Sequence, residues 1–169
     1  MYYLRITKYN PKYRNSNDIY PGEEWASFSD IGNRFHDIEL TFDTYSAIED
    51  SYVDGVISIM NELDIKELKL TELEKYYYDK QFDNSNGNMK IIYDSIKEDM
   101  HISIDKIGLL IKLILREMIW GKLVSNNLFV HFGYDYYMYI GSSIPILKSK
   151  ELIEKSGLFV ENIKSPYLN

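Results

Sequence analysis

Three histidines and many carboxylates are the residues of this protein that could take part in acid–base catalysis or bind a metal ion. His36, His101 and His131 lie far apart, and none has the spacing of a metal-binding motif. His36 is followed by Asp37 and could form a metal pair with it. His131 is expected on a strand, where it shares a face with Phe129. This setting is more typical of a hydrogen-bonded sheet histidine than of a catalyst.

The sequence motifs of nucleophilic and phosphate chemistry do not occur. The chain has no cysteine, which excludes a disulfide framework, a thiolate zinc site and a cysteine nucleophile. It contains no Gly-x-Ser-x-Gly elbow, no glycine-rich phosphate loop and no EF-hand spacing. We therefore expect no catalytic residues, no cofactor and no metal ligands. The alternative left open is a metal-dependent hydrolase that uses carboxylates with His36 or His131.

Acidic residues are concentrated between Asn15 and Asp64. This segment carries twelve acidic residues against one basic residue, Arg34, whereas the whole chain has a net charge of −7. Asp50 and Asp54 are four residues apart on one predicted helix face, and such a like-charge pair weakens a helix by about 0.2–0.5 kcal/mol. The pattern favours a surface that attracts a basic partner. The alternative is a solvated face that only keeps the protein soluble.

Tyrosine is abundant, with 16 residues that cluster at 76–78 and 134–139. Tyrosine and tryptophan anchor many protein interfaces because they join a large apolar area to a polar group. Strand alternation places Tyr136, Met138 and Ile140 on one face and Tyr137 and Tyr139 on the other. We expect the first set in the core. The alternative is that these tyrosines only reflect strand propensity.

The charge balance and the hydropathy also exclude some partners. A general nucleic-acid binder needs a basic surface, which this acidic chain lacks. The most apolar run, residues 104–120, contains five charged residues and is not typical of a membrane span. The first nine residues alternate polar and apolar side chains, unlike an export signal. We expect a cytoplasmic protein that contacts neither nucleic acid nor membrane.

The elements that must position these residues follow from periodicity and turn signals. We predict one α+β domain over residues 1–169, with helices packed on a small, mostly antiparallel sheet. The predicted strands are 2–9, 65–70, 128–132, 136–140 and 158–162. The predicted helices are 41 or 43 to 63, 89–99, 104–123, and a short one capped by Ser149 and closed by Gly157. The helix over 104–123 is apolar almost all round, so we expect it to be nearly fully buried, with Lys112 and Arg116 on its one exposed stripe.

Two stretches carry a family resemblance. The first is the opening strand 2–9 with the following acidic loop, which contains Glu24-Trp25 and residues 28–32; the second is the aromatic hairpin 131–139 with residues 156–161. Both resemble bacterial immunity proteins of polymorphic toxin systems, including contact-dependent growth inhibition. The resemblance implies a cytoplasmic, non-enzymatic inhibitor that binds the C-terminal toxin domain of a cognate effector, often a nuclease. It carries over no catalytic residue.

An acidic, aromatic surface would suit the basic cleft of a nuclease toxin, and charge complementarity would speed capture. The candidate contact residues are Glu23, Glu24, Trp25, Asp30, Asp37, Asp50, Asp54, Tyr134, Asp135 and Tyr137. An interaction protein unrelated to toxins would have the same charge pattern and stays an alternative. Exposed tyrosines could also serve self-association, so the sequence leaves the oligomeric state open.

Overall fold

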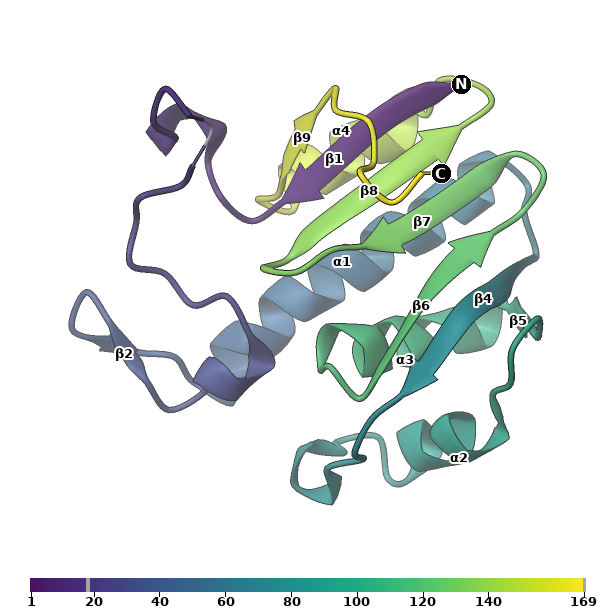
Figure 1. Cartoon of the computed structure of the whole chain (residues 1–169), viewed down its shortest axis with the longest axis horizontal. Coiled ribbons are helices and arrows are strands. Elements are labelled where there is room, and N and C mark those ends of the chain that lie inside the picture. Colours follow the sequence, from purple (N-terminus) through teal and green to yellow (C-terminus); the bar gives the residue numbers. More distant parts are fainter. Residues whose placement is uncertain (18, 169) are drawn as a thin grey trace.

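The centre of the structure is an antiparallel sheet with helices on one of its faces. The computed structural model describes residues 1–17 and 19–168. In this part of the chain, seven strands hydrogen-bond in the order β5-β4-β6-β7-β8-β1-β9. All neighbouring strands are antiparallel. Helices α1, α3 and α4 lie behind the sheet in Figure 1. The α+β prediction is confirmed, although the sheet is wider than the small one we expected.

The elements have the following bounds. The strands of the sheet are β1 Tyr2–Thr7, β4 Glu67–Lys75, β5 His101–Ser103, β6 Ile119–Val124, β7 Leu128–Phe132, β8 Tyr137–Ser142 and β9 Phe159–Glu161. The α-helices are α1 Phe42–Glu62, α2 Asn88–Ser95, α3 Ile104–Leu115 and α4 Leu147–Lys155. A separate hairpin pairs β2 Arg34–Phe35 with β3 Ile38–Glu39, and short 3-10 turns occupy Pro11–Tyr13, Phe28–Asp30 and Lys80–Phe82.

Helix α1 has the amphipathic pattern and the N-cap that its sequence predicts. The Thr41 Oγ1 accepts a hydrogen bond from the Thr44 backbone N–H at 3.2 Å, which satisfies one of the free donors of the first turn. Along the buried face, Tyr45, Tyr52 and Ile59 are completely shielded from solvent. They join one hydrophobic core with the inward side chains of the sheet. This helix therefore forms the main support behind the central strands.

The prediction of one buried helix over 104–123 is wrong in its second half. Helix α3 ends at Leu115, the chain turns at Glu117 with a positive φ of 56°, and β6 begins at Ile119. Strand β6 lies between β4 and β7 near the middle of the sheet. A strand that is largely buried on both faces has a nearly continuous apolar sequence, which periodicity alone does not separate from a buried helix. Arg116, expected on an exposed stripe, is only 3% exposed.

The hairpin of β7 and β8 is confirmed, with a tight turn at its end. The Gly133 N–H donates to the Tyr137 carbonyl at 2.7 Å, and the Tyr137 N–H donates to the Tyr134 carbonyl at 3.3 Å. The two central residues, Asp135 and Tyr136, have φ values of 59° and 61°. These are the values of a type I′ turn, whose twist matches that of the two strands. A bulky residue in this backbone conformation is unusual and needs other contacts to hold it.

The remaining predicted elements are present with shifted ends. Strand β4 is longer than the predicted 65–70, and α2 is shorter than the predicted 89–99. Helix α4 begins at Leu147, so Ser149 lies inside it and does not cap it. The cap comes from Glu62 at the end of α1, whose carboxylate accepts from the Ser149 N–H at 2.7 Å and from its hydroxyl at 2.6 Å. A cap supplied by another helix has no local sequence signal.

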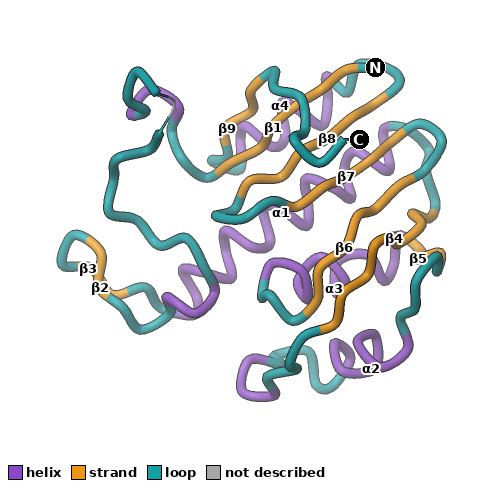
Figure 2. Tube along the Cα trace, in the orientation of Figure 1, coloured by secondary structure: helices purple, strands orange, loops and turns teal. Residues whose placement is uncertain are grey.

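A long loop joins β1 to α1, as the sequence predicts. Figure 2 shows it in teal, with the β2–β3 hairpin projecting from its second half. The loop returns to the body at Trp25 and Phe28, which pack on the core. Glu24 of this loop is therefore held beside Asp135 at the end of the β7–β8 hairpin.

Candidate functional site

A pocket of about 400 Å³ opens beside the β7–β8 turn. It is formed where the start of β6, the turn itself and the segment after β4 meet, and we call it the aromatic pocket. The lining residues are Ala26, Tyr76, Ile114, Leu115, Glu117, Ile119, Trp120, Phe132, Gly133, Tyr134, Asp135 and Tyr136. Strands β4, β6, β7 and β8 are consecutive in the sheet, so sheet order brings these distant segments together.

Aromatic rings and two carboxylates give the aromatic pocket its chemistry. Tyr134 is 81% exposed and Tyr76 is 48% exposed. The Trp120 Nε1–H donates to the Phe132 carbonyl at 3.3 Å, which fixes the indole against β7. Glu117 and Asp135 are both exposed residues of the lining. An apolar pocket with a few placed charged groups is the usual form of a binding site.

The acidic loop forms one side of this region. The Ser27 hydroxyl donates to Glu117 Oε1 at 2.7 Å, joining the loop to the turn before β6. A second pocket of about 290 Å³, the loop pocket, shares Ala26 and Asp135 with the aromatic pocket. Its other lining residues are Tyr9, Ile19, Tyr20, Gly22, Glu24 and Tyr137. The two pockets therefore make one continuous face.

A lysine of the chain occupies the loop side of this face. The Lys8 Nζ lies 4.0 Å from the ring centroids of both Tyr9 and Trp25 and 3.3 Å from Glu24 Oε2. Burial lowers the pKa of Lys8 to about 8, against the opposing attraction of Glu24 and Asp135. The chain thus already binds a cation between aromatic rings and carboxylates here.

The turn is held from below by a cluster of buried tyrosines. The Tyr136 hydroxyl donates to the Tyr45 hydroxyl, and the Tyr52 hydroxyl donates to the Tyr136 carbonyl at 2.6 Å. Trp25 lies edge-on to the Tyr136 ring, with centroids 4.9 Å apart. Burial raises the pKa of Tyr136 far above its ordinary value. These contacts offset the cost of a left-handed tyrosine and keep the turn in one conformation.

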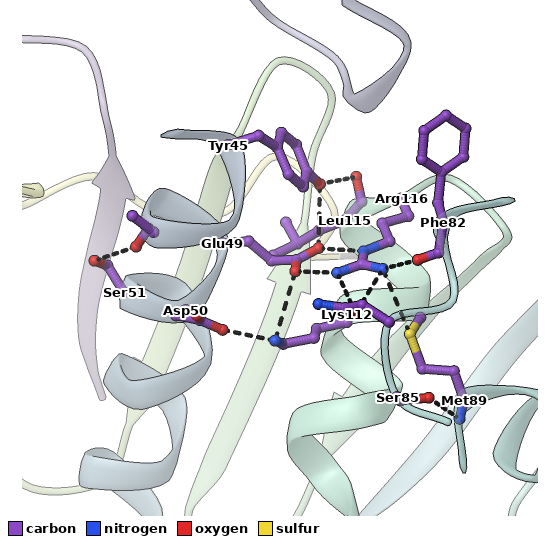
Figure 3. Close-up of polar contacts among 12 residues, drawn as sticks. Tyr45, Glu49, Asp50, Ser51, Phe82, Ser85, Met89, Lys112, Leu115 and Arg116 are labelled. Carbon is purple, nitrogen blue, oxygen red and sulfur yellow. Dashed lines mark hydrogen bonds and ion pairs between the residues drawn. The ribbon is translucent and has the colours of Figure 1, made fainter. Parts of the chain in front are cut away.

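Behind the tyrosines lies a buried ion pair that sequence reasoning missed. Figure 3 shows the Arg116 guanidinium against the Glu49 carboxylate, with Nε–Oε1 at 2.7 Å and Nη2–Oε2 at 2.6 Å. Both side chains are completely buried. Arg116 also donates to the Phe82 carbonyl, and the Tyr45 hydroxyl donates to Glu49 at 3.2 Å. The sequence signal was weak: Glu49 lies at helical spacing between Tyr45 and Tyr52 on the apolar face of α1, and Arg116 directly follows an apolar run.

Several acidic residues of the segment 15–64 have internal roles, so they do not all form a surface for a basic partner. Glu49 pairs with Arg116, and Glu62 caps α4. Asp30 accepts from the backbone N–H groups of Ala26 and Ser27 at 2.8 and 3.0 Å. Part of the acidic excess therefore serves the fold and not a partner.

The structure brings together half of the predicted contact residues. Glu24, Trp25, Tyr134, Asp135 and Tyr137 lie in or beside the two pockets. Exposed Glu23 adjoins Glu24 in the loop, and Asp30 stabilises the same loop from within.

The other three predicted contact residues lie elsewhere. Asp37 is in the β2–β3 turn, with a positive φ of 63°. Asp50 pairs with Lys112 at 2.6 Å on the helical side. Asp54 is exposed further along α1, beside a groove against α4. Three lining residues of the aromatic pocket, Tyr76, Glu117 and Trp120, were not predicted because they come from segments that meet only in the folded sheet.

The histidines stay apart in the fold. His131 is 4% exposed and stacks on Phe129 at 4.4 Å, and its Nδ1 lies 2.9 Å from the Ser165 Oγ. The prediction of a hydrogen-bonded sheet histidine is confirmed. Across the described ranges, no group of three or more His, Asp or Glu side chains is placed to hold a metal ion.

The environment of His131 predicts a dependence of stability on pH. Burial, together with nearby Lys122, lowers the pKa of His131 to about 4, below its ordinary 6.5. Between pH 6.5 and 4 the unfolded chain binds a proton that the folded chain does not, so the free energy of unfolding falls as pH falls. The slope from this one group is at most about 1.4 kcal/mol per pH unit.

The measurement is urea unfolding at several pH values between 4 and 7. We expect His131→Asn to have a shallower slope than the unsubstituted protein. His36→Asn, at an exposed histidine of the β2–β3 turn, is the matched control. If the free energy of unfolding depended equally on pH in all three proteins, His131 would not be the source of this pH dependence.

No protein-family model, curated protein or solved structure matches this chain. Within residues 1–17 and 19–168, none of the helices has both the length and the apolar character needed to cross a membrane.

Proposed function

We propose that this chain is an immunity-type inhibitor that binds and neutralises a basic toxin domain, without catalysis, through the face formed by the aromatic pocket and the loop pocket. The observation that carries the proposal is the joining of these two pockets at Asp135, with exposed carboxylates at both pockets and exposed tyrosines at the aromatic pocket. Rigid aromatic side chains supply contact area, and carboxylates supply charge complementarity to a basic protein.

The chemistry of a nuclease toxin fits such a face. A nuclease needs a cleft rich in lysine and arginine to hold phosphates, and an acidic surface competes for the same groups. The long-range field of the acidic residues would also speed association and make it sensitive to salt. We place the inhibitor and its toxin in the same compartment, the cytoplasm, as the resemblance to immunity proteins implies.

The test is co-expression with the protein encoded immediately upstream, followed by pull-down. We expect a one-to-one complex, loss of the partner's toxicity, and an affinity that falls as salt rises. An interaction protein unrelated to toxins would form a complex without silencing any toxicity. Absence of a complex would contradict the proposal.

A matched pair of variants locates the surface. Glu117→Gln/Asp135→Asn removes two charges at the aromatic pocket, and Asp54→Asn/Asp105→Asn removes two exposed charges from helices. We expect the first variant to weaken the complex about tenfold or more, since a hydrogen bond to a charged group contributes about 1.5–3 kcal/mol. The second should bind almost as the unsubstituted protein does. Equal weakening by both variants would mean that net charge, and not this face, drives binding.

A further inference from the structure

We infer that the aromatic pocket is the receptor for one arginine side chain of the partner protein, an inference that rests on the proposed function and makes it specific. The pocket is the larger of the two and lies at the end of a rigid hairpin. At about 400 Å³ its volume is in the range of ordinary small-ligand sites, about 300–1,000 Å³. It can therefore accept a long side chain together with its neighbouring main chain.

The lining matches a guanidinium better than other groups. Tyr76, Trp120 and Tyr134 line the pocket with aromatic rings, and a planar guanidinium stacks on such rings and is attracted by their quadrupole. Glu117 and Asp135 offer carboxylates, with which arginine forms paired charge-assisted hydrogen bonds. A phosphate or another anion would be repelled by the same two carboxylates. A lysine would find the charge but would lose the planar stacking and would be harder to desolvate.

The loop pocket and the aromatic pocket differ in one respect: within residues 1–17 and 19–168, only beside the loop pocket does the protein place a cation of its own against the carboxylates. In the loop pocket region, Lys8 already lies between Tyr9, Trp25 and Glu24. Among the residues that the structure describes, no lysine or arginine forms an ion pair with Glu117 or Asp135. The aromatic pocket thus repeats the surroundings of Lys8, with carboxylates that are available to a cation from outside.

The pocket is also organised before anything binds. Trp120 is fixed by its hydrogen bond to Phe132, and Ser27 holds one oxygen of Glu117. Tyr136 anchors the turn that carries Tyr134 and Asp135 to the buried tyrosine cluster. Side chains that are already placed lose little freedom on binding, which favours a specific contact over a diffuse electrostatic one.

The test uses small probes that need no toxin. Acetyl-arginine methylamide, the lysine analogue and the neutral citrulline analogue are titrated into the isotope-labelled protein and followed by NMR. The chain has two tryptophans, so their indole N–H signals separate the pocket, at Trp120, from the Lys8 region, at Trp25. We expect saturable shifts at Trp120 and at the amides of 133–135 with the arginine probe, and little change at Trp25.

The controls separate charge from shape. We expect citrulline to cause no saturable shift and lysine to bind at least severalfold more weakly than arginine. Glu117→Gln/Asp135→Asn should weaken the arginine probe about tenfold or more, and Asp54→Asn/Asp105→Asn should leave its affinity unchanged. Equal binding of arginine and citrulline, or of arginine and lysine, would overturn the inference. The inference would also be overturned by chemical shift changes spread evenly over the acidic residues. Unchanged binding of the arginine probe to Glu117→Gln/Asp135→Asn would overturn it as well.

Failure of this inference can be distinguished from failure of the proposed function. If the toxin complex forms but no probe binds at Trp120, the pocket does not receive arginine and the proposed function stands. If the arginine probe binds as described but no toxin is neutralised, the pocket recognises arginine in some other basic protein and the proposed function is wrong.

Discussion

Replacing Arg116 by methionine is expected to lower the free energy of unfolding by about 3–5 kcal/mol, because the change leaves Glu49 as an unpaired charge in the core. Both side chains of the pair are completely buried. The Lys112 Nζ is 3.7 Å from Glu49 Oε2 and offers only partial compensation, since it is also engaged by Asp50 at 2.6 Å. The variant also loses the hydrogen bond from Arg116 to the Phe82 carbonyl.

Urea unfolding of three variants, each compared with the unsubstituted protein, measures the effect. We expect Glu49→Leu/Arg116→Met to recover part of the loss, because an apolar pair of similar size removes the unpaired charge. As a surface control, Lys150→Met breaks an exposed i,i+4 pair with Glu154 and should cost less than about 1 kcal/mol. A single variant no less stable than this control would show that Glu49 takes up a proton or finds water, and that the pair contributes little.

Tyr136→Ala is expected to cost about 3–5 kcal/mol, the usual loss for a large buried aromatic residue. Tyr136 is 5% exposed and lies against Trp25, Tyr45 and Tyr52, with ring centroids 4.9, 6.0 and 5.6 Å away. Its truncation would leave a cavity under the β7–β8 turn. The aromatic pocket would then lose both its floor and the fixed position of Asp135.

Two further variants divide this effect into its parts. Tyr136→Phe keeps the ring and removes only the hydroxyl, so we expect a loss of about 0.5–1.5 kcal/mol. Tyr134→Ala changes an 81% exposed residue of the same turn and should alter stability by no more than about 0.5 kcal/mol. Thermal and urea unfolding give the three values. If Tyr136→Ala and Tyr134→Ala lowered the free energy of unfolding by the same small amount, the buried tyrosine cluster would not be what stabilises the turn.

Elements with a local signal were predicted well from the sequence. Helix α1 was predicted within a residue or two because its apolar stripe repeats at helical spacing and Thr41 provides a cap. The β7–β8 hairpin was found because two alternating runs flank a short turn segment. The boundary between α3 and β6 was missed because an apolar run without alternation does not distinguish a buried helix from a buried strand.

The sequence by itself determined the α+β class, the acidic excess and the tyrosine-rich hairpin, since composition, periodicity and turn residues are properties of short stretches. Only the tertiary structure decided which charges remain available to a partner. Glu49 and Arg116 are 67 residues apart, and Glu62 caps a helix that begins 85 residues later. The aromatic pocket likewise needs the order β4-β6-β7-β8 to bring Tyr76, Glu117, Trp120 and Asp135 to one place. Contacts between distant segments form because the whole core buries apolar surface together, and no local pattern encodes that sum.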